Sequence, residues 1–179
     1  MKSLILCAGL LLPQCSHAAT LEVDPTRSRI QVDAKATGHS FTGDLTKYSV
    51  KASGDGKTNI PSALSLAWDF NDLKTADEKR DDVMIKWLGG GNPKGSFTLV
   101  KTSNETPTGG NAEGTLTVNG VSKTLTFPYT VKKDGDWMTL NGIVTMDYQN
   151  FKLPIIRTMA VMTVNPKLVI RFHVVGKIK

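Results

Sequence analysis

Apolar and polar residues alternate along most of the chain, which is the pattern of a strand with one buried face. The clearest alternating runs lie at residues 29–36, 63–70, 138–146 and 168–174. Because successive side chains of a strand point to opposite faces, each run collects its apolar residues on one side. The pattern therefore predicts several antiparallel strands, each of which must cover its apolar face with another part of the molecule.

A two-residue turn at Asn119-Gly120 is predicted to join two further strands. Asn-Gly between alternating apolar and polar residues is a strong hairpin signature. The turn would pair Val118 with Val121 and Leu116 with Lys123. One face of this hairpin then carries the apolar residues Leu116, Val118, Val121, Leu125, Phe127 and Tyr129. Thr124 and Thr126 are expected on the opposite face, in water.

One segment has helical spacing in place of strand spacing. Its apolar residues recur every three or four positions, at Val83, Met84, Trp87 and Leu88. The run Thr75-Ala-Asp-Glu78 is predicted to open this helix as a capping box, and Gly89–Gly91 are predicted to end it. The sequence thus predicts a single short amphipathic helix among the strands.

Pro93 leads into another predicted strand, in which Phe97 and Leu99 share a face, and residues 102–111 are predicted to form a polar loop. No internal repeat and no linker divides the sequence, so a single domain is expected. One-sided antiparallel strands with one helix can close into a barrel or pack as a two-sheet sandwich. Periodicity alone leaves both architectures open.

The first residues are typical of a secretory signal peptide. Lys2 precedes an apolar run and the small residues before Ala18 and Ala19, and cleavage is predicted after one of these two alanines. The predicted organisation is a signal peptide over 1–18 and a single domain over 19–179, exported and, in a Gram-negative bacterium, periplasmic. Both cysteines, Cys7 and Cys15, lie in the removed segment, so the mature chain has no disulfide, no thiol nucleophile and no cysteine metal site.

The mature chain keeps a positive charge. Loss of Lys2 lowers the formal net charge from +6 to +5. The basic residues are scattered over many strands and turns, which favours solubility over nucleic-acid binding. Transient contact with an anionic membrane surface is the next possibility, and a homodimer is left open.

Candidate catalytic groups are few. His39 and His173 are the histidines of the mature chain, and His39 precedes Ser40. Adjacent strand residues point to opposite faces, so His39 is predicted to lie in a loop or at a cavity mouth, and His173 on the surface. The acidic residues over 77–82 are expected to cap the helix. No catalytic residue, metal site or cofactor is predicted.

Several motifs, in order along the chain, resemble those of the YceI-like family of exported bacterial proteins. The segment from Gly114 to Val121 resembles the family's G-x-L-T-x-x-G motif. The other matching segments are Val23-Asp24-Pro25 with Ser28 and Ile30, Gly38 to Leu45, Lys79-Arg80-Asp81 with Met84 and Leu88, and Pro93 to Phe97. Val83 departs from the family's frequent histidine, and Tyr148 and Asn150 stand near its usual arginine and aspartate.

The resemblance implies a mainly β fold, a lipocalin-like eight-stranded antiparallel barrel with one short helix. Its elongated cavity would enclose a long isoprenoid of quinone or polyprenyl type, or another lipid, for carriage, storage or sequestration, without catalysis. The predicted ligand-binding residues are Ile30, Val32, Leu64, Leu66, Trp68, Phe70, Leu116, Val118, Leu125, Phe127, Tyr129, Met138, Leu140, Val144, Ile170 and Phe172. The alternatives are a barrel enzyme that uses His39 or the acidic cluster on a bound lipid, and a stress-related interaction protein with a filled core.

Overall fold

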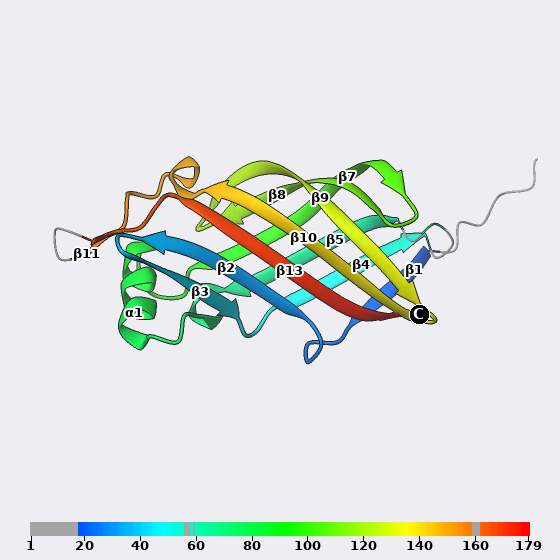
Figure 1. Cartoon of the computed structure of the whole chain (residues 1–179), viewed down its shortest axis with the longest axis horizontal. Coiled ribbons are helices and arrows are strands. Elements are labelled where there is room, and N and C mark those ends of the chain that lie inside the picture. The colour runs from blue at the N-terminus through cyan, green and yellow to red at the C-terminus, as the bar shows by residue number, and fades with distance from the viewer. Residues whose placement is uncertain (1–17, 56–57, 59, 159–161) are drawn as a thin grey trace, which may run out of the picture.

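The computed structural model describes residues 18–55, 58, 60–158 and 162–179. Nearly all of the predicted signal peptide therefore lies outside the described residues. The chain forms a closed eight-stranded antiparallel barrel with one short helix, α1 (Glu78–Trp87), at one end. Figure 1 shows α1 at the left end of the elongated barrel, and β1 with the C-terminus at the right end. The predicted fold class is confirmed, and the sandwich alternative is excluded.

Each of the first three barrel strands consists of two pieces. They are β1 (Ala18–Val23) with β2 (Arg29–Ala36), β3 (His39–Leu45) with β4 (Ser49–Asp55), and β5 (Pro61–Asp69) with β6 (Leu73–Lys74). The remaining barrel strands are continuous: β7 (Lys94–Thr106), β8 (Gly109–Val118), β9 (Val121–Asp134), β10 (Trp137–Asp147) and β13 (Lys167–Ile178). Neighbours along the chain pair as a meander. Shorter elements are the 3₁₀ helices η1 (Phe70–Asp72) and η2 (Tyr148–Phe151), and a small hairpin of β11 (Arg157–Thr158) and β12 (Met162–Thr163).

The barrel closes because β13 pairs with both pieces of the first strand. Residues Val169–His173 pair with β2, and Gly176–Ile178 pair with β1. The intervening loop folds against Val175. Its Ser28 hydroxyl accepts a hydrogen bond from Val175 N at 2.9 Å and donates one to Val175 O at 3.1 Å. Side-chain bonds thus satisfy the backbone of β13 where the strand ladder is interrupted.

The hairpin at Asn119-Gly120 has the predicted register. Val118 pairs with Val121, and Leu116 pairs with Lys123. Asn119 has φ of 46° and Gly120 has φ of 82°, a left-handed backbone that Asn and Gly tolerate best. Thr124 and Thr126 are exposed, as predicted.

Helix α1 begins later than the predicted capping box. Its N-cap is Asp77, whose carboxylate accepts a hydrogen bond from Arg80 N at 3.1 Å. Ala76 has φ of 61°, so the helix cannot extend back to Thr75. Thr75 instead donates its N–H and its hydroxyl to Asp81 Oδ1, at 3.0 and 2.6 Å. The predicted stop is confirmed, since Gly89–Gly91 all have positive φ. None of the helices in the described part of the chain has the length and apolar content needed to cross a membrane.

The predicted polar loop over 102–111 is wrong, because strands occupy most of it. Strands β7 and β8 continue to a tight turn, with Ser103 paired to Asn111 and Thr106 paired to Gly109. Backbone hydrogen bonds hold this extension, and its side chains are mostly exposed. A hairpin that projects beyond the apolar interior needs no apolar face, so hydrophobic periodicity cannot reveal it.

The Asn119 side chain also joins the hairpin to α1, since its Nδ2 donates to Leu88 O at 2.6 Å. We expect Asn119→Ala to lower the free energy of unfolding by about 1–3 kcal/mol, because it loses this bond and strains the turn. Asn119→Gly keeps the turn conformation and loses only the bond, so its loss should be clearly smaller. Denaturant unfolding measures the loss in free energy of unfolding for both variants. Equal losses would show that backbone strain contributes nothing.

Candidate functional site

An apolar cavity of about 530 Å³ runs inside the barrel. Alternate residues of its strands supply the lining, so the period-two pattern continues around the interior. Every predicted ligand-binding residue except Met138 lines this cavity: Ile30, Val32, Leu64, Leu66, Trp68, Phe70, Leu116, Val118, Leu125, Phe127, Tyr129, Leu140, Val144, Ile170 and Phe172. The barrel is therefore hollow. Whether these residues contact a ligand stays a prediction.

Met138 lies outside this cavity. It lines a much smaller void of about 30 Å³ at the β1 end, where Leu140 and Pro61 border both spaces. The alternation along β10 correctly predicts that Met138 faces inward. The cavity reaches only as far as Leu140, the next inward-facing residue of the strand, and stops short of Met138. A sequence pattern shows which face of a strand is buried and cannot show how far along the strand the interior stays open.

Sequence reasoning missed part of the lining. Phe97 and Leu99 come from a strand that was recognised without being assigned to the site, and Met146 continues the inward face of a strand that was assigned. Leu153 and Ile156 belong to the irregular segment after η2, where no periodicity exists. The first group could have been found from alternation, whereas the second carries no such signal.

Three aromatic rings lie against glycines of the neighbouring strand. Trp68 covers Gly95, Phe97 covers Gly114 and Phe172 covers Gly142. In each case a Cβ on the glycine would overlap the ring, so only glycine leaves room for it. Large rings thus form part of the wall without filling the interior. Gly114 is the first glycine of the G-x-L-T-x-x-G segment, which gives that motif position a physical role.

The deeper lining is uncharged. Phe127 packs between Phe97 and Phe172, with ring centroids 5.7 and 5.8 Å apart. Burial raises the pKa of Tyr129, and the charge of Glu105 raises it further. Burial also raises the pKa of Tyr148, whose hydroxyl donates to Val164 O at 2.8 Å. Both phenols therefore stay protonated at neutral pH.

The cavity mouth lies at the α1 end of the barrel. The exposed residues of the lining, His39, Asp77, Lys79 and Val83, all lie at this end. Trp87 and Met84 of α1 also line the cavity, and Trp87 Nε1 donates to Pro154 O at 2.7 Å. His39 was predicted to lie in a loop or at a cavity mouth, and its place in the lining at this end agrees with that prediction.

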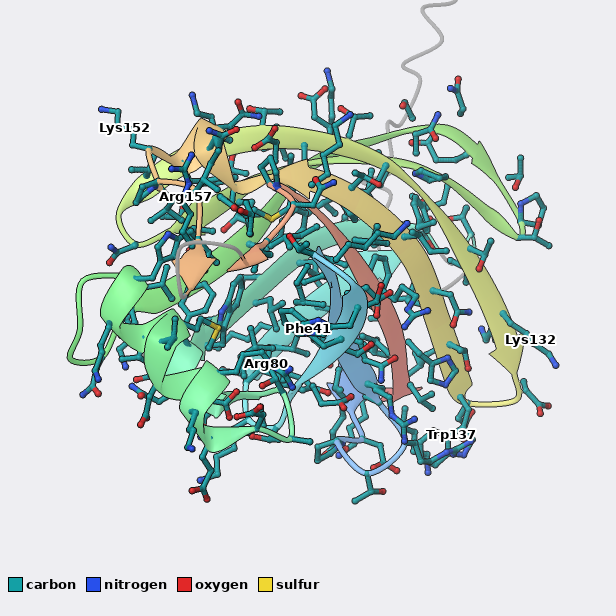
Figure 2. All side chains as sticks on the ribbon, turned by 60° about the vertical axis from the view of Figure 1, so that its left-hand side comes forward. Phe41, Arg80, Lys132, Trp137, Lys152 and Arg157 are labelled. Atoms are coloured by element: carbon teal, nitrogen blue, oxygen red, sulfur yellow. The ribbon has the colours of Figure 1, made fainter. Side chains whose placement is uncertain are left out.

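Arg80 is fixed at this mouth by several contacts. Its Nε donates to Thr75 Oγ1 at 2.9 Å, and its Nη2 donates to Thr75 O at 2.6 Å. Its guanidinium lies 4.3 Å from the centre of the Phe41 ring, and the His39 ring lies 6.1 Å from that of Phe41. Figure 2 looks toward this end and shows Phe41 and Arg80 side by side between α1 and β3. Arg80 and Asp81 both hold α1 to Thr75, as a brace between helix and barrel would.

The remaining candidate groups have hydrogen-bond partners within the fold. His173 is exposed on the outer surface and bonds to Asn141 at 2.6 Å. Within the acidic cluster, Asp77 caps α1 and Asp81 bonds Thr75. No group of three or more potential metal ligands occurs within the described residues.

The fold and the cavity define a lipocalin-like barrel with an enclosed apolar site. The chain belongs to the YceI-like domain family, whose model matches residues 21–176. None of the curated proteins matches the chain significantly.

Solved structures share this fold. BcnA from Burkholderia cenocepacia is 20% identical, with a TM-score of 0.73 over 87% of this chain and 100% of that one. A polyisoprenoid-binding domain from Saccharophagus degradans is 12% identical, with a TM-score of 0.66 over 90% of this chain and 98% of that one. The YceI protein of Campylobacter jejuni is 20% identical, with a TM-score of 0.62 over 76% and 84%. At these identities the likeness establishes the fold.

We expect Gly95→Ala to lower the free energy of unfolding by about 1–3 kcal/mol, because the new methyl group displaces the Trp68 ring toward the cavity. In an unobstructed strand the same change would stabilise by roughly 0.5–1 kcal/mol. Denaturant unfolding shows whether Gly95→Ala lowers or raises the free energy of unfolding. Thr98→Ala, at an exposed position of the same strand, is the matched control and should change little. A more stable Gly95→Ala protein would refute the packing of Trp68 on Gly95.

Proposed function

We propose that this protein binds an isoprenoid lipid, with the apolar chain enclosed in the barrel. The observation that carries the proposal is the continuous apolar cavity of about 530 Å³ with a single polar end. A cavity of this size is within the range of small-molecule sites, and its lining offers a lipid chain apolar contact on all sides. The structural likeness to a polyisoprenoid-binding domain supports the same class of ligand.

The cavity volume sets the length of chain that can be enclosed. At about 30 Å³ for a water-sized group, 530 Å³ holds roughly 18 non-hydrogen atoms, or three to four isoprene units. Burial at about 0.8 kcal/mol per methylene-sized group then gives on the order of 14 kcal/mol. Association costs on the order of 4–15 kcal/mol, so a chain that fills the cavity binds and a much shorter one is not retained. A longer chain would extend out of the mouth at α1.

Binding without chemical conversion is the second part of the proposal. A general base is normally oriented by a hydrogen bond and faces a group whose proton it removes. The His39 side chain makes no hydrogen bond within the described part of the chain, and its ring contact is with Phe41. The carboxylates Asp77 and Asp81 accept bonds from their own segment. These groups support the α1 end, and none is arranged as a nucleophile with its base.

The third part of the proposal concerns location and role. The predicted signal peptide would export the chain to the periplasm, where an isoprenoid has no apolar medium between the membranes. Enclosure in a barrel would keep such a lipid in solution for carriage, storage or sequestration. Transient contact with a membrane surface would serve its loading.

Tryptophan fluorescence can test enclosure, because the three tryptophans differ in position. Trp68 and Trp87 line the cavity, whereas Trp137 does not line it and stacks with Arg27, 4.3 Å from ring centre to guanidinium carbon. We expect isoprenoid alcohols to change the emission of Trp137→Phe protein. Affinity should rise at least tenfold per added isoprene unit up to three or four units and then level off.

The matched control carries Trp68→Phe and Trp87→Phe, so that Trp137 alone emits. Its emission should stay unchanged on addition of the same alcohols. A response of equal size in both proteins would indicate binding on the outside of the barrel. Solvent extraction of the purified protein, followed by mass spectrometry, shows whether it carries a lipid. If the protein neither carries a lipid nor retains one that is added to it, the proposal is wrong.

Export makes a separate prediction. Expressed in a Gram-negative host, the full-length chain should be recovered from the periplasmic fraction and begin at Ala19 or Thr20, as intact-mass measurement shows. Replacing Leu10, Leu11 and Leu12 by polar residues should retain the uncleaved chain in the cytoplasm. Recovery of full-length chain from the periplasm would contradict the predicted cleavage.

A further inference from the structure

Away from α1, the cavity ends near the part of the barrel where β1 and the C-terminus lie (Figure 1). The void of about 30 Å³ lies beyond this end. Two residues, Leu140 of β10 and Pro61 of β5, border both the cavity and the void. The interior of the barrel is thus interrupted at these two residues and continues for a short distance behind them.

Leu140 and Pro61 belong to opposite walls of the barrel. In the ring of strands, β7, β8 and β9 lie between β5 and β10 on one side, and β4, β1 and β13 lie between them on the other. An eight-stranded barrel is so narrow that inward side chains from opposite walls can close its interior. The two residues therefore form a neck across the interior, between the cavity and the void.

Leu140 is firmly held in this neck. It pairs with Val131 on β9 and with Val174 on β13, and all three residues are buried. Valine is stiff at χ1, and close packing leaves a buried side chain little room to move. Met138, the next inward residue toward the void, is only half-buried and has a flexible, unbranched side chain. Leu140 is therefore the fixed part of this end of the interior.

We propose that Leu140, opposite Pro61, is a stop for the ligand chain and sets the number of isoprene units that the barrel encloses. This inference rests on the proposed function and adds the residue that determines chain length. Apolar contact alone does not limit length, because each added methylene group gains affinity as long as it is buried. A fixed end to the cavity sets the limit, since further units stay in water.

Truncation of Leu140 should join the cavity to the void. The carbons that Leu140→Ala removes and the void of about 30 Å³ together give room for roughly four non-hydrogen atoms, close to one isoprene unit. We expect the longest alcohol that still gains affinity to be one unit longer for Leu140→Ala than for the wild type. The gain for that unit should be at least about tenfold. The measurement is the dissociation constant for farnesol, geranylgeraniol and geranylfarnesol, followed by tryptophan fluorescence.

Met138→Ala is the matched control. Met138 faces inward from the same strand but borders only the void, so its truncation leaves the neck in place. Its chain-length limit should equal that of the wild type. Binding of farnesol, the shortest of these alcohols, shows that a variant is folded. If Leu140→Ala does not bind farnesol, Leu140→Val keeps more of the packing and should show the same shift with a smaller gain.

A Leu140 variant that binds farnesol and keeps the wild-type limit would overturn the stop and leave the proposed function intact. An equal shift in Met138→Ala would also overturn it, because the limit would then depend on looser packing of this end and not on the neck. Loss of farnesol binding from both Leu140 variants would show that Leu140 supports the whole site and is no stop. Failure of the wild type to bind any of the alcohols would overturn both proposals.

Discussion

The hollow interior depends on the contact between aromatic rings and glycines. A barrel of eight strands is narrow enough for ordinary side chains to fill it completely. Gly95, Gly114 and Gly142 let the rings of Trp68, Phe97 and Phe172 lie against the neighbouring strand, where a Cβ would overlap each ring. The same three residues thus provide both the apolar surface and the space beside it. A chain with alanine at these positions would keep its strand pattern and lose part of its cavity.

Helix α1 is attached to the barrel by polar contacts and by the half-buried side chains of Met84 and Trp87. None of the residues within Glu78–Trp87 is buried, and the helix is tied down at Thr75, Pro154 and Asn119. Hydrogen bonds contribute about 0.5–1.5 kcal/mol each, far less than the packing of a buried helix face. The cavity is therefore closed by an element without a buried residue, at the same end where its exposed lining residues lie.

The sequence could predict the interior face of most strands, since alternation follows directly from backbone geometry. It also predicted the hairpin at Asn119 in full, because its turn requires residues that tolerate positive φ. Prediction from the sequence failed at positions where tertiary contacts determine the local structure. The extension of β7 and β8 is held by backbone pairing alone, and the true N-cap, Asp77, was chosen over Thr75 because Thr75 bonds Asp81. Nor could it place Leu153 and Ile156, or show that Lys79 reaches the same cavity as Phe127.

A hollow barrel without disulfides carries a cost that ligand binding can offset. Cys7 and Cys15 are the only cysteines of the chain, and both precede the first strand, so packing alone stabilises the barrel. Side chains that face an empty space lose the dispersion contacts that a filled core provides. A ligand that occupies the cavity restores these contacts only in the folded state, and its binding free energy adds to the stability of that state. Glycines that let the rings lie against the wall thus exchange part of the stability of the empty protein for space inside the barrel.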